Sequence, residues 1–284
     1  MASKPDKHII EKLMTPNECS FTNEGAVCSP RHLVDRMKDF IIDKRGSLDT
    51  TIRTPEHIVQ NIKSMLDCES ESCIFKRKEF LEFAKLNNID SILDEFFKPK
   101  GPANSFALLN NFNIDDVLDQ FEIKFADKKF LHIPFQMRDF ERIGTELASV
   151  DLADKFKHGY KTFGVVLNTD YSSGGGIHWF CLFGENYTDH ISIEYFNSSG
   201  KPPLPEVQAW MQKQKHYLEK SMSKPVKLLY STGIVFQHDN HSCGVYSVCY
   251  IWLRLEGIPQ QWFKTETFND KIMHHARKAI FRHS

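Results

Sequence analysis

The sequence predicts an α+β fold in which a helical N-terminal arm precedes a core with a small mixed sheet flanked by helices. Over roughly the first hundred residues, apolar side chains recur at the three- and four-residue spacing of amphipathic helices. After residue 104, short apolar runs bounded by Gly, Asn, Asp or Ser are typical of strands. A turn-rich joint, KPKGPANS at residues 98–105, separates the two. We therefore expect an arm domain over residues 1–103 and a core domain over residues 104–284.

Four helices are expected in the arm. The first follows Ser29-Pro30, where a serine can cap the helix and a proline suits its first turn, and it ends at Gly46. Thr54-Pro55 opens the second helix in the same way. The remaining two are predicted over residues 75–86 and 91–97.

The core elements follow from the same two patterns. Helical spacing of apolar residues predicts helices, and short apolar runs between turn residues predict strands. The expected helices cover residues 113–121, 137–147, 204–222, 243–255 and 268–281. The expected strands cover residues 161–168, 179–183, 190–196, 226–230 and 234–236.

Composition limits the classes of function. The 36 Lys and Arg against 37 Asp and Glu give a net charge of -1, and neither part of the chain is a basic arm. This balance argues against a requirement for nucleic acid. No run approaches the roughly 18 apolar residues of a membrane span, and the N-terminus lacks the apolar stretch of a secretory signal. The oligomeric state is not indicated.

The seven cysteines are an odd number in a chain large enough to fold without disulfides. They favour a reducing compartment, with thiols that are buried, reactive or metal-bound. Four of them form a separate set, for which buried or incidental thiols are expected and metal binding or virion disulfides are the alternatives. This set is Cys19, Cys28, Cys68 and Cys73.

A second group of possible zinc ligands lies close together in the sequence. It contains His238, His241, Cys243 and Cys249. Their spacing is not that of a zinc finger or ribbon, so no metal ligand is predicted.

The segment from Gln237 to Gly244 points to nucleophilic chemistry, because Cys243 stands where a loop enters an apolar helix. The free N–H groups of a first helical turn carry partial positive charge, so we expect them to lower the pKa of this thiol. Gly244 is expected to let a substrate backbone approach. Gln237 can offer an amide N–H to an oxyanion, with the backbone N–H of Cys243 as second donor. The alternative is a buried structural cysteine.

A nucleophilic cysteine needs a base, and the base needs an orienting group. Of the 13 histidines, His178 is singled out because it follows the glycine-rich loop at 171–176 and opens a predicted strand. Asn197 ends the next strand, so the two side chains can lie together if the strands pair. A neutral carboxamide would fix the imidazole ring without full charge stabilisation.

The order His178-Trp179, Asn197, Gln237, Cys243 resembles the Ulp1/adenain-type cysteine peptidase family, whereas papain-like enzymes place the cysteine first. The likeness is strongest to the polyprotein-processing proteases of the asfarvirus (African swine fever virus) branch. It extends over GPANSFALLNNFNIDD, PFQMRDFER, FGVVLNTDYSSGGGIHW, SIEYFNSSG and CGVYSVCYI. The cysteine-bearing segment at 67–73 is similar to the N-terminal arm of that branch.

The resemblance implies a role for each matching residue. His178 matches the general base, Asn197 the orienting residue and Cys243 the nucleophile. Gln237 matches the oxyanion donor, with Asn240 as its rival. Asn197 departs from the aspartate usual in cellular members and agrees with the asfarvirus branch.

Two further residues are expected along the substrate path, the first from the resemblance and the second from its place before the glycine-rich loop. Trp179 matches the tryptophan that covers a narrow tunnel in SUMO-processing members, where any Cβ beside the scissile bond would clash with the walls. Asn168 is expected either to bind the extended substrate backbone or simply to cap a turn. The resemblance thus implies a late viral endopeptidase without cofactor, cleaving structural polyproteins at Gly-Gly-X junctions. Host cytoplasm and virion are its expected locations.

Three other functions stay open. One is an isopeptidase that removes SUMO or ubiquitin-like modifiers. Another is an acyltransferase, because the same nucleophile geometry transfers acyl groups in that clan. The last is a binding module that retains the fold without catalysis.

Overall fold

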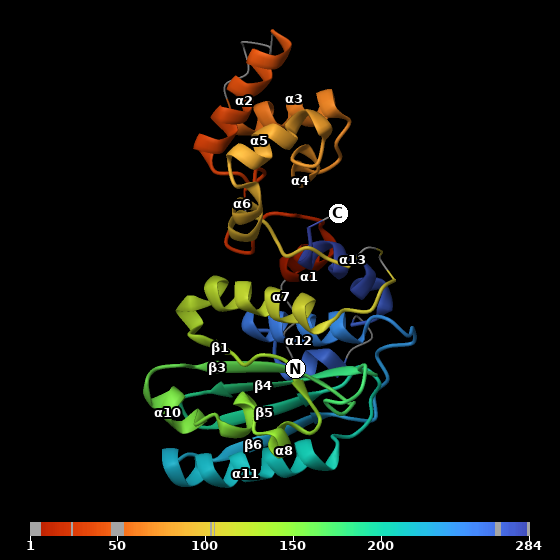
Figure 1. Ribbon diagram of the computed structural model, residues 1–284. Helices are drawn as coiled ribbons and strands as arrows, with labels where there is room; N and C mark the ends of the chain where they lie inside the picture. The colour runs from red at the N-terminus through yellow and green to blue at the C-terminus, as the bar shows by residue number, and fades with distance from the viewer. Residues whose placement is uncertain are drawn as a thin grey trace.

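The structure is a computed structural model that describes residues 7–23, 25–46, 54–102, 104, 106–264 and 268–282 (Figure 1). The predicted α+β class is confirmed, with helices covering a central sheet and a helical part lying beyond it. Within these residues, no helix has the length and apolar character needed to cross a bilayer.

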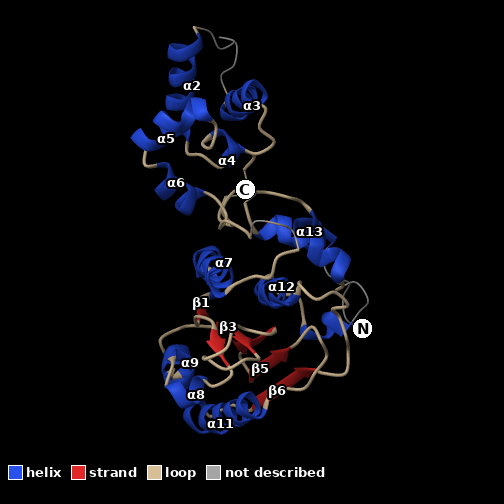
Figure 2. Ribbon diagram, turned by 45° about the vertical axis from the view of Figure 1, so that its right-hand side comes forward, coloured by secondary structure: helices blue, strands red, loops and turns tan. Residues whose placement is uncertain are grey.

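The sheet is mixed and follows the order β1-β3-β4-β5-β6, with β2 pairing beside β3. Its centre, β3-β4-β5, is antiparallel, while β1, β2 and β6 pair in parallel. The strands are β1 Phe130–His132, β2 Gln136–Met137, β3 Thr162–Asn168, β4 Trp179–Asn186, β5 Ile191–Phe196 and β6 Val226–Ser231. Because helices cover both faces (Figure 2), β3 and β5 are buried at every residue and lack alternation.

The core helices cover both faces of the sheet (Figure 2). They are α7 Asn111–Lys124, α8 Phe140–Ile143, α9 Glu146–Ser149, α10 Leu152–Lys157, α11 Pro205–Met222, α12 Cys243–Leu255 and α13 Asp270–Ile280, with short 3₁₀ turns at Ala126–Lys128 and Gln260–Lys264. Helix α13 lies beyond α12 on one of the two faces. Helix α12 packs against β4 and α7 and is buried along its whole length. That burial explains why its sequence is apolar on every side.

Two of the predicted core elements are wrong. The single helix expected at 137–147 is interrupted by Gly144, whose φ of +71° ends α8, so two short helices replace it. The strand expected at 234–236 is a loop, because Phe236 and Gln237 donate their N–H groups to the carbonyl of Ser198 rather than to a neighbouring strand.

The arm helices begin largely where expected. They are α2 Arg31–Arg45, α3 Pro55–Leu66, α4 Glu71–Ile74, α5 Leu81–Leu86 and α6 Ile89–Phe96, with a 3₁₀ turn at Lys78–Phe80. Gly46 ends α2 in the left-handed conformation, and the Thr54 side chain accepts a hydrogen bond from the N–H of His57. The helix expected over 75–86 is shorter than predicted, because only the 3₁₀ turn and α5 fall within that span. The short helix α4, capped by Ser70, lies ahead of it and was not predicted.

An unpredicted helix, α1 Lys7–Met14, lies with the core rather than with the arm helices (Figure 1). It packs against α13, and Leu13 joins the apolar cluster that surrounds α12. Phe21 also belongs to that cluster, with its ring 5.2 Å from that of Trp252. The first described helix therefore belongs to the core side. The expected boundary residue Ala103 lies outside the described residues.

The four cysteines of the separate set form two disulfides, so the expectation of buried or incidental thiols is wrong for them. Cys19 pairs with Cys28 and Cys68 pairs with Cys73. Cys181, Cys243 and Cys249 are free and buried. Disulfides persist in oxidising surroundings, so this pairing disagrees with the reducing compartment inferred from the odd count.

Candidate active site

The sheet brings His178 and Asn197 together. In the antiparallel pairing of β4 with β5, Cys181 lies opposite Phe196, so the residue before β4 and the residue after β5 share one end of the sheet. The Nε2 atom of His178 lies 2.8 Å from Oδ1 of Asn197. The arrangement expected from two pairing strand ends is therefore present.

The hydrogen bonds of Asn197 determine which ring nitrogen of His178 carries the proton. The backbone N–H and the Oγ–H of Ser199 donate to Oδ1 of Asn197 at 3.0 and 2.8 Å, while Nδ2 donates to the hydroxyl of Tyr195 at 2.9 Å. A backbone N–H can only donate, so the atom it meets must be the oxygen. His178 must then carry its proton on Nε2, which leaves Nδ1 free as a base.

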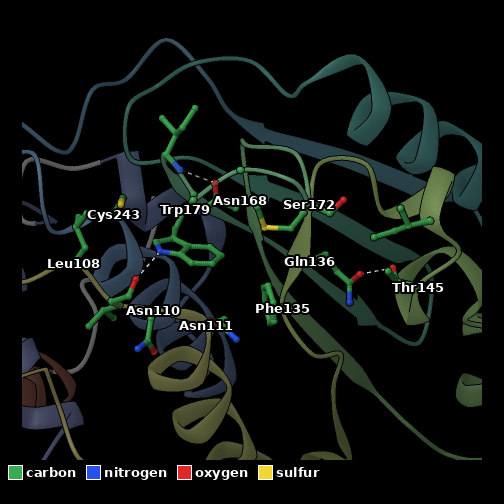
Figure 3. A pocket seen from close by; sticks show the side chains of 17 residues that line it. Leu108, Asn110, Asn111, Phe135, Gln136, Thr145, Asn168, Ser172, Trp179 and Cys243 are labelled. Atoms are coloured by element: carbon green, nitrogen blue, oxygen red, sulfur yellow. Dashed lines mark hydrogen bonds between the residues drawn. The ribbon is translucent and has the colours of Figure 1, made fainter.

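Cys243, the first residue of α12, lies where two cavities meet. One cavity, of about 710 Å³, is lined by His178, Asn197, Gln237 and Asn240 as well as Cys243. The other, of about 650 Å³, is lined by Trp179, Asn168, glycines 174–176 and Cys243 (Figure 3). The two cavities are thus lined between them by all seven residues singled out in the sequence, and Cys243 lines both.

Burial sets the resting charge state of the pair. The Cys243 side chain is only 3% exposed, and desolvation raises the pKa of its thiol even though backbone N–H groups at Trp179, Gly244 and Cys243 itself work in the opposite direction. Burial also lowers the pKa of His178, and its bond to Asn197 offsets this only in part. The expected lowering of the thiol pKa is therefore wrong: both shifts favour a neutral thiol beside a neutral imidazole.

Gln237 is held in place at the wall of the first cavity. Its Oε1 accepts a hydrogen bond from the Ser198 hydroxyl at 2.7 Å, and its Nε2 donates to the carbonyl oxygen and Oδ1 of Asp239, both at 3.1 Å. Asn240 is exposed at the same cavity. Both candidate amide donors therefore lie beside Cys243.

Gly244 makes room for Leu109 rather than for a substrate, which corrects the role expected for it. A Cβ added at Gly244 would lie 3.0 Å from Cβ of Leu109. The carbonyl oxygen of Leu109 in turn accepts the indole N–H of Trp179 at 2.9 Å. This chain of contacts fixes the indole along the second cavity, and neither contact was predicted from the sequence.

Asn168 closes the glycine-rich loop. Its Oδ1 accepts hydrogen bonds from the N–H groups of Asp170 and Ile177 at 3.0 and 2.9 Å. Its hydrogen bonds are therefore those of a turn cap, and the side chain also lines the second cavity. Gly176, at φ +89°, completes the turn.

Sequence reasoning missed the residues that orient Asn197, namely Tyr195 and Ser199. The available signal was the Asn-Ser-Ser-Gly run after β5, a composition typical of tight turns. Tyr195 had no such signal, because a tyrosine in a buried strand is ordinary.

Comparison with known proteins shows extensive similarity to one group. The chain is 37% identical over 290 residues to the SUMO-1 cysteine protease of African swine fever virus (isolate Pig/Kenya/KEN-50/1950), which covers 96% of this chain and 98% of that protein. It is 21% identical over 217 residues to a putative thiol protease of Acanthamoeba polyphaga mimivirus, covering 76% of this chain and 70% of that one. No family model matches the chain.

The fold comparison agrees. The crystal structure of the African swine fever virus protease superposes with a TM-score of 0.79 at 31% sequence identity, covering 95% of this chain and 97% of that one. The resemblance to the asfarvirus branch drawn from the motifs is thereby confirmed.

Proposed function

Since this chain belongs to the cysteine protease family of African swine fever virus, we propose that it cleaves structural polyprotein precursors after Gly-Gly during virion maturation. Family membership makes it a cysteine peptidase that acts on protein substrates. The observation that carries the proposal is the fixed tautomer of His178, which leaves a free base at the cavity that Cys243 also lines.

The first half of the reaction forms a thioester. The sulfur of Cys243 attacks the carbonyl carbon as its proton passes to Nδ1 of His178, while Asn197 keeps the other ring nitrogen protonated. The backbone N–H of Cys243 and the amide of Gln237 stabilise the oxyanion, with Asn240 as the alternative amide donor. The imidazolium then gives its proton to the amine, the C–N bond breaks and the amine leaves.

The second half restores the enzyme. Water attacks the thioester as His178 takes one of its protons, and the C–S bond breaks when the oxyanion collapses. The imidazolium returns its proton to the sulfur of Cys243. The neutral resting pair suits this route, because proton transfer accompanies attack instead of preceding it.

The two cavities suggest the direction of the bound peptide. The leaving amine must meet His178, which lines the first cavity, so the acyl half occupies the second cavity beside Trp179. A Gly-Gly segment lacks the Cβ atoms that would meet the indole, and Asn168 faces the same path. This supports the choice of Gly-Gly before the scissile bond.

We further propose a division of the chain in which α2 to α6 form an arm that helps to present large precursors. The core then consists of residues 104–284 together with α1, which the sequence pattern assigns to an arm over 1–103. Host-cell assembly sites and the virion are the proposed locations. Two disulfides suit a protein that spends part of its life in the virion, outside the reducing cytosol.

Mass spectrometry of cleaved peptides tests the proposal. A library of Gly-Gly-X peptides should be cut after the second glycine by the wild type and left intact by Cys243→Ala. Replacing either glycine by alanine should abolish cleavage. Cleavage that ignores both replacements would contradict the Gly-Gly proposal, and cleavage by Cys243→Ala would remove the nucleophile assignment.

A second function is favoured by the name of the relatives, which are called SUMO-1 cysteine proteases. This chain would then remove a SUMO-like modifier from a lysine side chain. Comparing kcat/KM on a folded SUMO-1 conjugate and on a Gly-Gly-X peptide separates the two: a strong preference for the conjugate supports the isopeptidase.

A further inference from the structure

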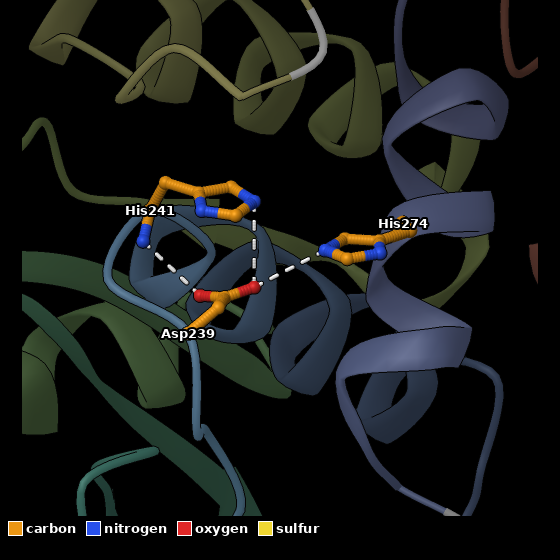
Figure 4. A group of neighbouring side chains, drawn as sticks. All are labelled: Asp239, His241 and His274. Atoms are coloured by element: carbon orange, nitrogen blue, oxygen red, sulfur yellow. Dashed lines mark hydrogen bonds and ion pairs between the residues drawn. The ribbon is translucent and has the colours of Figure 1, made fainter.

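Three side chains with metal-ligand chemistry meet beside the candidate active site (Figure 4). Asp239 and His241 come from the loop that leads into α12, and His274 comes from α13. One potential ligand atom from each lies within 4.8 Å of the other two. Nε2 of His241 and Nε2 of His274 lie 3.4 and 3.2 Å from the same carboxylate oxygen, Oδ2 of Asp239.

These distances match a zinc site. Two ligands that bind zinc at about 2.0–2.1 Å with a tetrahedral angle lie about 3.3 Å apart. The two imidazole rings are almost parallel, with centroids 5.4 Å apart. Their nitrogens approach the Asp239 oxygen from two different sides (Figure 4). A small inward movement of the three side chains would place one cation between them.

His241 shows the need for such a cation most clearly. Its Nε2 is buried and has no hydrogen-bond partner among the described residues, although it lies next to a carboxylate. Its Nδ1 faces Oδ1 of Asn240 at 3.4 Å. Metal-binding histidines commonly use their second nitrogen in this way to fix the ring.

The surrounding groups allow a divalent cation. The Asp270 carboxylate lies alongside, accepting hydrogen bonds from the N–H groups of His238 and Asp239. The opposing charge is Arg277, whose guanidinium donates to the carbonyl oxygen of His241 at 3.1 Å. Two carboxylates thus outweigh one guanidinium, and the exposed edge of His274 leaves a path for entry.

We propose that Asp239, His241 and His274 bind a divalent transition-metal ion of the zinc class, with solvent in the fourth position. The ion would fasten α13 to the N-terminal turn of α12, because Asp239 also accepts hydrogen bonds from the N–H and the hydroxyl of Ser242, the residue before Cys243. It would therefore brace the loop that carries the nucleophile. Of the four possible zinc ligands that lie close together in the sequence, only His241 belongs to this proposed site.

Metal binding is best measured in a background without the reactive thiol. The full chain with Cys243→Ala, disulfides intact and no reductant, is titrated calorimetrically with Zn²⁺. We expect one equivalent to bind. His274→Ala in the same background should weaken binding by more than about 100-fold. Losing a residue that only supports a metal ligand lowers the metal affinity by at most about 100-fold, so a larger loss indicates a ligand. His275→Ala, one residue further along α13, is the matched control and should bind like its parent.

Two further measurements bear on the same site independently of peptidase activity. Co²⁺ in place of Zn²⁺ should give the intense visible bands of tetrahedral coordination, which His274→Ala removes. Saturating Zn²⁺ should raise the Tm of the parent and of His275→Ala, but not of His274→Ala. Equal affinity in the two histidine variants, or no binding at millimolar Zn²⁺, would overturn the proposal. His274→Gln keeps the bulk of this exposed side chain but not the imidazole. It should lose Zn²⁺ binding as His274→Ala does, which shows that the loss does not come from misfolding.

Discussion

The hydroxyl of Tyr195 offers the sharpest test of how His178 is oriented. Tyr195→Phe removes the one partner that Nδ2 of Asn197 has among the described residues, a hydrogen bond of 2.9 Å at a residue that is 2% exposed. An unsatisfied buried donor costs about 1–3 kcal/mol. The amide cannot relieve this by flipping, because Nδ2 would then face the N–H of Ser199, which also donates.

The variant should therefore lose about 1–3 kcal/mol of unfolding free energy, measured by urea denaturation. Its kcat should fall by up to about tenfold, because a misplaced His178 that raises the activation free energy by about 1.4 kcal/mol slows the reaction tenfold. Its KM should change little. Tyr230→Phe is the control, because its hydroxyl also accepts an amide hydrogen bond, from Gln208 at 3.1 Å, but does not contact Asn197. Equal kcat values for the two variants would refute the reasoning.

Four other outcomes follow from the site and the arm. Gln237→Ala should retain activity at about 10²–10³-fold lower kcat, measured on a Gly-Gly peptide; an unchanged kcat would transfer the donor role elsewhere. Gly244→Ala should destabilise the fold by about 1–3 kcal/mol through overpacking, checked by thermal unfolding; a Tm equal to wild type would contradict the close contact there. Catalysis needs neutral His178, and burial lowers the pKa of this histidine, so the midpoint of the acidic limb of the kcat/KM profile should lie below pH 6.5. A midpoint above pH 6.5 would argue against a neutral pair. Replacing both Cys19 and Cys28 by alanine should cost about 2.5 kcal/mol, the chain-entropy value for a loop of this length, read from the loss of Tm against Cys181→Ala; no loss would show that the bridge is dispensable.

The positions of His178 and Asn197 were predictable because local patterns determine them. Each lies at the end of a strand with clear boundaries, and adjacent strands commonly pair. Cys243 was predictable for a similar reason, since an apolar helix begins at that residue. Such features depend on neighbours in the sequence.

The resting charge of Cys243 was not predictable, because its burial depends on distant segments. Leu109 lies more than 130 positions earlier yet packs against Gly244 beside the nucleophile. The meeting of Asp239 with His274 is likewise a product of tertiary packing. The loop at 234–236 shows the same limit, since Ile234 and Phe236 pack against the core without pairing as a strand.

The chain passes between core and arm twice, once in each direction. The arm is therefore an insertion into the core rather than an N-terminal extension. Cys19 pairs in antiparallel fashion with Phe97, Lys98 donates its N–H to the carbonyl of Glu18, and α1 precedes this double crossing. Deleting everything before residue 104 would thus strip a packed helix, with Leu13, from the core. A clean excision should instead join the chain just after Phe21 to the chain near Phe97 through a short linker, leaving both ends where they already lie side by side.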